Sequence, residues 1–158
     1  GKNLLIDVGV TFKGSNNIIC KDNVWIDSNV IINVPIGKLE IGNNVHINAN
    51  CFLGGRGKII LEDFTGLSVG VCIFTGSMKI GNLKDMLPNP TMNVNLDAIF
   101  YGDVVLKENS VALANSVISP NVIMEKGSIL MTNSFLNKNT ESNSIYMGSP
   151  AKKIGIRR

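Results

Sequence analysis

The sequence is poor in charged and aromatic residues and contains a single histidine. Of its 158 residues, 17% are charged, 6% are aromatic and 44% are hydrophobic. A chain with this much hydrophobic and this little charged sequence is not expected to be intrinsically disordered. Its length fits one domain with a substantial core and is too short for two ordinary domains.

Cysteine is also scarce. Cys20, Cys51 and Cys72 form no closely spaced pair of the CxxC kind, which argues against a zinc site and against a disulfide framework. An odd number of cysteines fits a reducing compartment, so we expect a cytoplasmic protein. No bound metal is expected.

Long apolar runs and basic clusters are missing as well. No run approaches the roughly 18 residues that a membrane-spanning helix needs, and the start of the chain lacks the layout of a signal peptide. The formal net charge is +3, and the basic residues are scattered until the pairs Lys152-Lys153 and Arg157-Arg158. We therefore expect neither a membrane span nor a nucleic-acid partner.

What the sequence does contain is a six-residue apolar period. This period fits neither an α-helix nor a single half-buried strand, but it fits a solenoid of short strands with one side chain per strand pointing to the axis. Asn and Gly recur just before the expected corners, where residues must tolerate a positive φ. The clearest run of the period is Phe100, Leu106, Ala112, Ile118, Met124, Leu130 and Leu136.

The period extends upstream with interruptions. It starts imperfectly at Val8 and Gly14, and two short breaks, 33–38 and 54–58, predict bulges at one corner of a triangular coil of about 18 residues. The longest break, 75–97, predicts an ordered arm that folds over a neighbouring surface. The inward positions expected in this part are Cys20, Ile26, Ile32, Ile41, Ile47, Leu53, Leu61, Leu67 and Ile73.

The pattern predicts a single all-β domain over residues 1–158. We expect coils over about 5–74 and 99–136, an extruded loop over about 75–98 and a C-terminal tail over 137–158.

Together, the hexads, the segment 117–122 and the ending Tyr146-x-Gly148-x-Pro150-Ala151-Lys152 resemble the hexapeptide-repeat acyltransferases, over nearly the whole chain. The segments 45–51, 63–68 and 89–91 resemble a branch from bacterial surface-polysaccharide gene clusters. This resemblance implies a left-handed parallel β-helix and an acetyl-CoA-dependent acetyltransferase. The acceptor would be a hydroxyl or amine of a nucleotide sugar or of a surface-glycan precursor.

The resemblance further implies direct acetyl transfer in clefts between the subunits of a homotrimer, with a histidine as general base. His46 is the one candidate, and it precedes the inward Ile47, so its side chain should point outward. The alternative is an exposed or interface histidine without chemistry. Trp25 precedes the inward Ile26 in the same way, which favours a subunit interface over a sugar-stacking platform.

In the family the pantetheine arm of CoA lies along the C-terminal coils, close to small corner residues. The resemblance assigns that contact to Ala114, Asn115, Thr132 and Asn133, adds the turn at Pro150, and offers Lys138, Lys152 and Lys153 to the CoA phosphates. The alternative for each is an ordinary corner residue or a solvated charge. The residues expected near the acceptor are Asp63, Asn89 and Lys79, and a corner-capping role is as good an interpretation of Asp63.

One departure from the family supports a second hypothesis. Met78 stands where the better-known sugar acetyltransferases have their histidine, and Lys79 stands where surface-polysaccharide relatives have an acid. The chain could therefore be a catalytically inactive trimeric scaffold or binding module. A γ-type carbonic anhydrase of the same fold is excluded, because that enzyme needs three histidine ligands.

Overall fold

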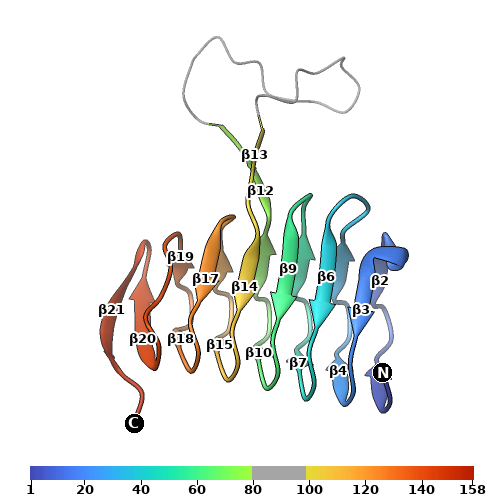
Figure 1. Cartoon of the computed structure of the whole chain (residues 1–158), viewed down its shortest axis with the longest axis horizontal. Helices are drawn as coiled ribbons and strands as arrows, with labels where there is room; N and C mark the ends of the chain where they lie inside the picture. The colour runs from blue at the N-terminus through green and yellow to red at the C-terminus, as the bar shows by residue number, and fades with distance from the viewer. Residues whose placement is uncertain (80–98) are drawn as a thin grey trace.

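Short strands wind around one axis in about six turns and stack into three parallel sheets, which we call faces 1, 2 and 3 (Figure 1). The architecture comes from a computed structural model, which describes residues 1–79 and 99–158. Successive strands along the chain occupy faces 1, 2 and 3 in turn, so each strand pairs with strands one turn away. The all-β solenoid predicted from the six-residue period is confirmed.

The strands of each face have the following bounds. Face 1 contains β1 (Leu4–Ile6), β4 (Val24–Ile26), β7 (His46–Ile47), β10 (Gly66–Leu67), β15 (Val111–Ala112), β18 (Ile129–Leu130), β20 (Ser144–Gly148) and β21 (Ala151–Ile156). Face 2 contains β2 (Thr11–Lys13), β5 (Ile31–Asn33), β8 (Phe52–Gly54), β11 (Cys72–Phe74), β16 (Val117–Ile118) and β19 (Phe135–Leu136). Face 3 contains β3 (Ile18–Cys20), β6 (Lys38–Ile41), β9 (Lys58–Leu61), β14 (Val104–Leu106) and β17 (Val122–Met124), and a short 3-10 helix, η1 (Ser15–Asn17), precedes β3.

The core is a column of aliphatic side chains along the axis. Successive turns align their inward residues in register, as Ile26 with Ile47 and Ala112 with Leu130, so each apolar layer is buried against the next. These predicted inward residues are at most 1% exposed: Ile26, Ile32, Ile41, Ile47, Leu53, Leu61, Leu67, Ile73, Leu106, Ala112, Ile118, Met124, Leu130 and Leu136.

Three predicted inward positions are wrong. Gly14 lies in the turn after β2 with φ 83°, and Phe12 is the residue of that strand that aligns with the buried Ile32. Val8 is 83% exposed, because it lies in the turn after β1 in the first turn of the solenoid. Phe100 is 40% exposed and lies in β13 (Ile99–Tyr101), which pairs antiparallel with β12 (Gly76–Met78). The solenoid therefore resumes at β14, and the coil predicted from residue 99 starts too early.

The corners follow the predicted chemistry. Asn109, Asn115, Asn121 and Asn133 have φ between 55° and 63°, and Gly127 has φ 68°. Asparagine and glycine reach this left-handed region at low cost, so each can reverse the chain between two short strands.

Where the structure describes the chain, its excursions leave the solenoid at the corner between faces 2 and 3. The breaks 33–38 and 54–58 connect β5 to β6 and β8 to β9, which confirms the bulges predicted there. The hairpin of β12 and β13 leaves from the same corner (Figure 1). The predicted arm falls mostly on residues 80–98, which lie outside the described residues.

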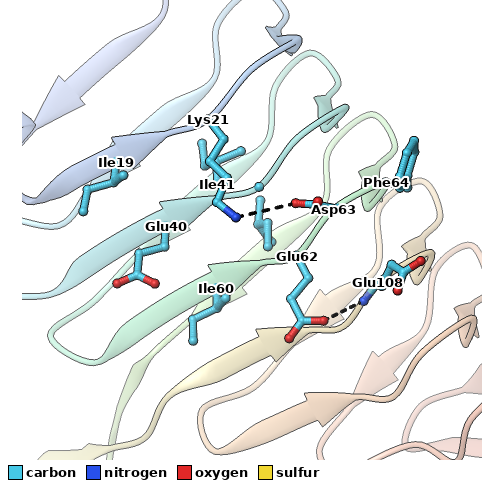
Figure 2. A pocket seen from close by; sticks show the side chains of 11 residues that line it. Ile19, Lys21, Glu40, Ile41, Ile60, Glu62, Asp63, Phe64 and Glu108 are labelled. Atoms are coloured by element: carbon cyan, nitrogen blue, oxygen red, sulfur yellow. Dashed lines mark hydrogen bonds and ion pairs between the residues drawn. The ribbon is translucent and has the colours of Figure 1, made fainter. Parts of the chain in front are cut away.

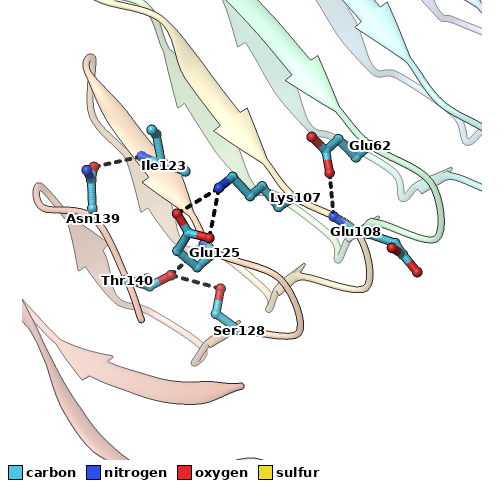
Figure 3. Close-up of polar contacts among 8 residues, drawn as sticks. All are labelled: Glu62, Lys107, Glu108, Ile123, Glu125, Ser128, Asn139 and Thr140. Carbon is cyan, nitrogen blue, oxygen red and sulfur yellow. Dashed lines mark hydrogen bonds and ion pairs between the residues drawn. The ribbon is translucent and has the colours of Figure 1, made fainter. Parts of the chain in front are cut away.

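The C-terminal segment closes the stack. β20 adds a parallel strand to face 1, and β21 folds back on it antiparallel. On face 3, the side chain of Asn139 accepts a hydrogen bond from the amide of Ile123 at 2.9 Å, and that of Thr140 accepts one from the amide of Glu125 at 2.8 Å (Figure 3). These side chains satisfy edge amides of β17 that would otherwise offer a pairing edge to another chain.

Among the described residues, no helix is long and apolar enough to cross a membrane.

Candidate functional site

His46 lies on the outer surface of face 1, as predicted. It begins β7, its side chain is 40% exposed, and the next residue, Ile47, is fully buried. Trp25 occupies the aligned outward position one turn earlier and is 43% exposed. The two rings stack with centroids 4.7 Å apart and an interplanar angle of 17°. This separation matches the spacing of neighbouring strands, so the register of β4 and β7 produces the stack.

Two polar side chains hold the imidazole of His46. Its Nε2 lies 3.1 Å from Oδ2 of Asp27, whose side chain is only 17% exposed. Its Nδ1 lies 3.4 Å from Nδ2 of Asn48, and Asn48 Nδ2 also donates to the carbonyl oxygen of Leu67 at 3.2 Å. The ring is thus fixed at one edge by a carboxylate and more loosely by an amide.

Gly66 leaves the other side of the imidazole without a side-chain neighbour in that column. In the register of face 1, Gly66 aligns with His46 on one side and with Val111 on the other. A Cβ at Gly66 would meet only the methyl groups of Val111, at 3.8 and 3.9 Å, which is ordinary contact. Neither crowding nor a positive φ requires glycine here. The absent side chain therefore opens space beside His46.

Cys51 supplies no nucleophile to this region. Cys51 is buried, its Sγ donates to the carbonyl oxygen of Ser68, and burial raises the pKa of the thiol to about 11. Only the thiolate is a good nucleophile, so Cys51 acts as a small apolar filler.

Asp63 lies on a different surface from His46. It lines an open groove of about 780 Å³ on face 3 and the following corner, together with Lys21, Glu62 and Glu108 (Figure 2). Asn43 donates to both Asp63 oxygens, from its amide at 2.8 Å and from its side chain at 3.0 Å. These bonds, with a smaller contribution from Lys21, lower the pKa of Asp63.

The other acids of the groove are also engaged. Glu62 accepts a hydrogen bond from the amide of Glu108 at 2.9 Å (Figures 2 and 3), and Glu40 pairs with Lys38 and Lys58 at 2.9 and 3.0 Å. The groove's carboxylates thus tie neighbouring turns together. This geometry agrees with the corner-capping interpretation of Asp63.

The four predicted pantetheine contacts lie on the corner between faces 1 and 2, which also contains Asp27 and Asn48. Ala114 and Asn115 connect β15 to β16, and Thr132 and Asn133 connect β18 to β19. The amide of Asn115 donates to the carbonyl of Val69 at 2.9 Å, and that of Asn133 donates to Ala114 at 3.0 Å. Thr132 is exposed and Ala114 half-buried, so small side chains line this edge.

The predicted phosphate contacts lie near the C-terminus. Lys138, Pro150, Lys152 and Lys153 are all exposed, and Pro150 is in the turn between β20 and β21. Lys153 Nζ is already paired with Oε2 of Glu141 at 2.6 Å. Both partners are solvent-accessible, so this pair is weak and an anion could replace it.

The acceptor contacts predicted near the arm are only partly described. Met78 ends β12 and is 45% exposed, and Lys79 follows it, also exposed. Asn89 lies outside the described residues.

Sequence reasoning missed Asp27, Asn48 and Gly66. Asp27 directly follows the inward Ile26, His46 directly precedes the inward Ile47, and Ile26 aligns with Ile47. The sequence shows the spacing between Ile26 and Ile47, which sets the length of that turn. It does not show that the side chains of Asp27 and His46 point toward each other.

Comparisons with known proteins agree with this architecture. No family model matches the chain. The dTDP-4-amino-4,6-dideoxy-D-glucose acyltransferase of Escherichia coli is 26% identical over 157 residues, which cover 99% of this chain and 81% of that protein.

Solved structures give the same result. A variant of AntD, an N-acyltransferase from Bacillus cereus, in complex with dTDP-4-amino-4,6-dideoxyglucose and coenzyme A, matches with a TM-score of 0.86 and 27% identity, covering 99% of this chain and 82% of that one. A hexapeptide-repeat acetyltransferase from Vibrio cholerae, complexed with acetyl coenzyme A, matches with a TM-score of 0.74 and 14% identity. The match covers 90% of this chain and 72% of that one, and at this identity it shows a similar fold only. The resemblance to hexapeptide-repeat acyltransferases is confirmed.

Proposed function

We propose that this chain is an enzyme that transfers an acyl group from an acyl-CoA to a sugar, with an amino sugar carried on a nucleotide as the preferred acceptor. One observation carries the proposal: nearly the whole chain superposes on AntD, whose structure contains a dTDP-linked amino sugar and coenzyme A. The similar E. coli protein is an acyltransferase named for the same kind of sugar.

The arrangement of the candidate residues supports the proposal. The corner between faces 1 and 2 continues from the partners of His46 to Ala114 and Thr132, joined by backbone hydrogen bonds from one turn to the next. A slender pantetheine arm fits along such an edge, because its residues there are small. The exposed Lys138, Lys152 and Lys153 would meet the CoA phosphates as point charges.

The chemistry that we propose is direct transfer. The acceptor nitrogen or oxygen attacks the thioester carbonyl carbon, a C–N or C–O bond forms, and the C–S bond breaks. His46 takes the proton that the acceptor loses and returns it to the departing CoA sulfur. Asp63, Lys79 and Asn89 remain proposed acceptor contacts, with Asp63 the weakest of them because its oxygens are already bonded to Asn43.

The test is incubation of the full chain with acetyl-CoA and dTDP-4-amino-4,6-dideoxyglucose, read by mass spectrometry. We expect a product heavier by one acetyl group. A parallel reaction with 3-hydroxybutyryl-CoA, the donor bound by AntD in another complex, tests acyl length. A panel of nucleotide sugars with only hydroxyl acceptors distinguishes O- from N-transfer.

Binding separates an enzyme from an inactive scaffold. CoA at 100 times its Kd should stabilise an intact enzyme by about 2.7 kcal/mol, seen as a raised melting temperature. Absence of both acyl transfer and CoA stabilisation would favour the scaffold.

His46→Gln tests the proposed base. Glutamine keeps a polar side chain at the site but cannot take up the proton, so we expect kcat to fall by roughly 10²–10⁴-fold with CoA stabilisation unchanged. Thr11→Gln, at an exposed position of face 2, is the control and should leave kcat as it is. An unchanged kcat in His46→Gln would remove His46 from the chemistry.

We further propose a homotrimer in which a second copy completes the cleft beside His46, and a cytoplasmic location, where acyl-CoA and nucleotide sugars are available. Outward apolar side chains on face 1 support the first point, and the three free cysteines fit the second.

A further inference from the structure

We propose that Asp27 is a positioning residue for His46: it selects the imidazole tautomer with hydrogen on Nε2, which makes Nδ1 the nitrogen that takes the acceptor's proton. The inference rests on the proposed function for its catalytic part. Its structural part, the tautomer, stands on the contacts of His46 alone.

The tautomer follows from groups whose hydrogen-bonding roles are fixed. A backbone carbonyl only accepts, so the bond to Leu67 fixes Nδ2 of Asn48 as the donating end of its amide. That nitrogen then also donates toward Nδ1 of His46, which must be unprotonated. On the other edge, the Asp27 carboxylate only accepts, so Nε2 must carry the hydrogen. Both neighbours therefore require the same tautomer.

The second oxygen of Asp27 indicates that the carboxylate is not there for stability. Oδ1 is buried, and it has no hydrogen-bond partner among the described residues. A buried carboxylate with a hydrogen bond to only one of its two oxygens destabilises the fold, unless a nearby positive charge offsets the cost of burying it. Among the described residues, the hydrogen-bond partner of the Asp27 side chain is the imidazole of His46, and an imidazolium formed during transfer would be stabilised by that charge.

Access to Nδ1 is also built into this part of face 1. The Asn48 contact, at 3.4 Å, is longer than a normal N–H···N bond, so an acceptor amine or hydroxyl can replace it at small cost. The missing side chain at Gly66 uncovers the imidazole on the side of the next turn. The proton then passes from the acceptor to Nδ1, while the other hydrogen stays on Nε2 and is donated to Oδ2 of Asp27.

The first experiment reads the tautomer without any substrate. The chain has one histidine, so ¹⁵N-histidine labelling of the untagged full chain gives one pair of ring nitrogen signals. At a pH of about 8, where an ordinary imidazole is neutral, we expect a protonated Nε2 and an unprotonated Nδ1. D27N should lose this preference and give a mixture, because an amide can either donate or accept. A wild-type spectrum with hydrogen on Nδ1, or a D27N spectrum unchanged from it, would overturn the proposal.

The second experiment is kinetic. D27N should lower kcat by at least about tenfold, with the KM for acyl-CoA and the melting temperature close to wild type, by analogy with an orienting carboxylate whose loss gives the wrong tautomer. The double variant D27N/H46Q should be no slower than H46Q, because Asp27 acts through His46. D7N is the matched control, since Asp7 has the aligned position one turn earlier but is exposed and lies two turns from His46.

The outcomes separate the two proposals. An additive loss in the double variant, or a melting temperature that falls while the tautomer stays, would show a structural role and overturn the positioning role. Absence of acyl transfer by a wild-type protein with the expected tautomer would instead overturn the proposed function.

Discussion

Glycine at position 66 has a low β-propensity, and nothing in the fold of a single chain requires it there. Its backbone is ordinary and a Cβ would have room, yet a side chain there would stand against the imidazole of His46. The simplest physical account is that the space is filled by the acceptor during the reaction. The glycine then belongs to the site and not to the fold.

Gly66→Val tests this account. Valine is favoured in strands, so the melting temperature should stay the same or rise slightly, while the KM for the acceptor should rise by about tenfold or more. Gly155→Val is the control, because Gly155 on β21 has equally open surroundings, with Ile145 at 3.9 Å. Equal kinetics for the two variants would contradict a role of Gly66 in acceptor binding.

At the scale of one corner, buried hydroxyls show how polar groups are tolerated in this core. Ser110 and Ser128 occupy aligned positions just before β15 and β18, and both are fully buried. Ser128 Oγ accepts a hydrogen bond from Thr140 at 3.0 Å (Figure 3), whereas Ser110 Oγ has no partner among the described residues. Valine fills the equivalent positions of earlier turns, at Val24 and Val45.

Replacement of each serine by alanine should therefore have opposite effects. Ser110→Ala removes an unsatisfied buried hydroxyl and should raise the free energy of unfolding by about 1 kcal/mol. Ser128→Ala breaks a made bond and should lower it by about 1 kcal/mol. Urea unfolding of both variants measures the difference, and a loss of stability in Ser110→Ala would contradict the argument.

The hydrogen bonds between Asn43 and Asp63, at the corner between faces 3 and 1, predict that the stability of the fold depends on pH in the acid range. Hydrogen bonds from Asn43 hold the pKa of Asp63 below its ordinary 3.8. A carboxylate whose pKa is lowered by folding stabilises the fold fully at pH values above its unfolded pKa, and that contribution is lost as the pH falls through the folded pKa. The effect is small, because the side chain is 38% exposed.

Asp63→Asn should therefore melt slightly below wild type at neutral pH, since asparagine offers Asn43 one oxygen in place of two. The two melting temperatures should converge as the pH falls below 3.8. Melting curves across this pH range measure the convergence, and a constant difference would contradict the linkage.

For the whole molecule, the main question is what covers the outward apolar side chains. Each face presents some of them, with Trp25 43%, Ile31 42% and Ile19 50% exposed on faces 1, 2 and 3. Exposed apolar surface on this scale is commonly buried by association. The homotrimer proposed above would cover part of it and complete the cleft beside His46.

Sedimentation equilibrium of the full chain should give a particle of three 17.0 kDa chains. Trp25 is the one tryptophan, so its fluorescence should shift to longer wavelength when dilution separates the subunits and water reaches the ring. A folded monomer at all concentrations would contradict the shared cleft.

The sequence by itself determined the solenoid, one buried residue on most of its strands and the chemistry of the corners. A six-residue period is a local property: it places one side chain per short strand on the axis, and asparagine or glycine at each reversal, whatever the rest of the chain does. The same period determined that His46 and Trp25 point outward, because each precedes an inward residue.

The tertiary structure alone decided which residues meet. Turns differ in length, since Ile26 aligns with Ile47 but Ala112 with Leu130, so bulges at one corner determine which side chains become neighbours. That is why the contact between Asp27 and His46, and the open position at Gly66, could be found only once the turns were stacked. The structure also shows that Phe100, although six residues before Leu106, lies in the antiparallel hairpin of β12 and β13.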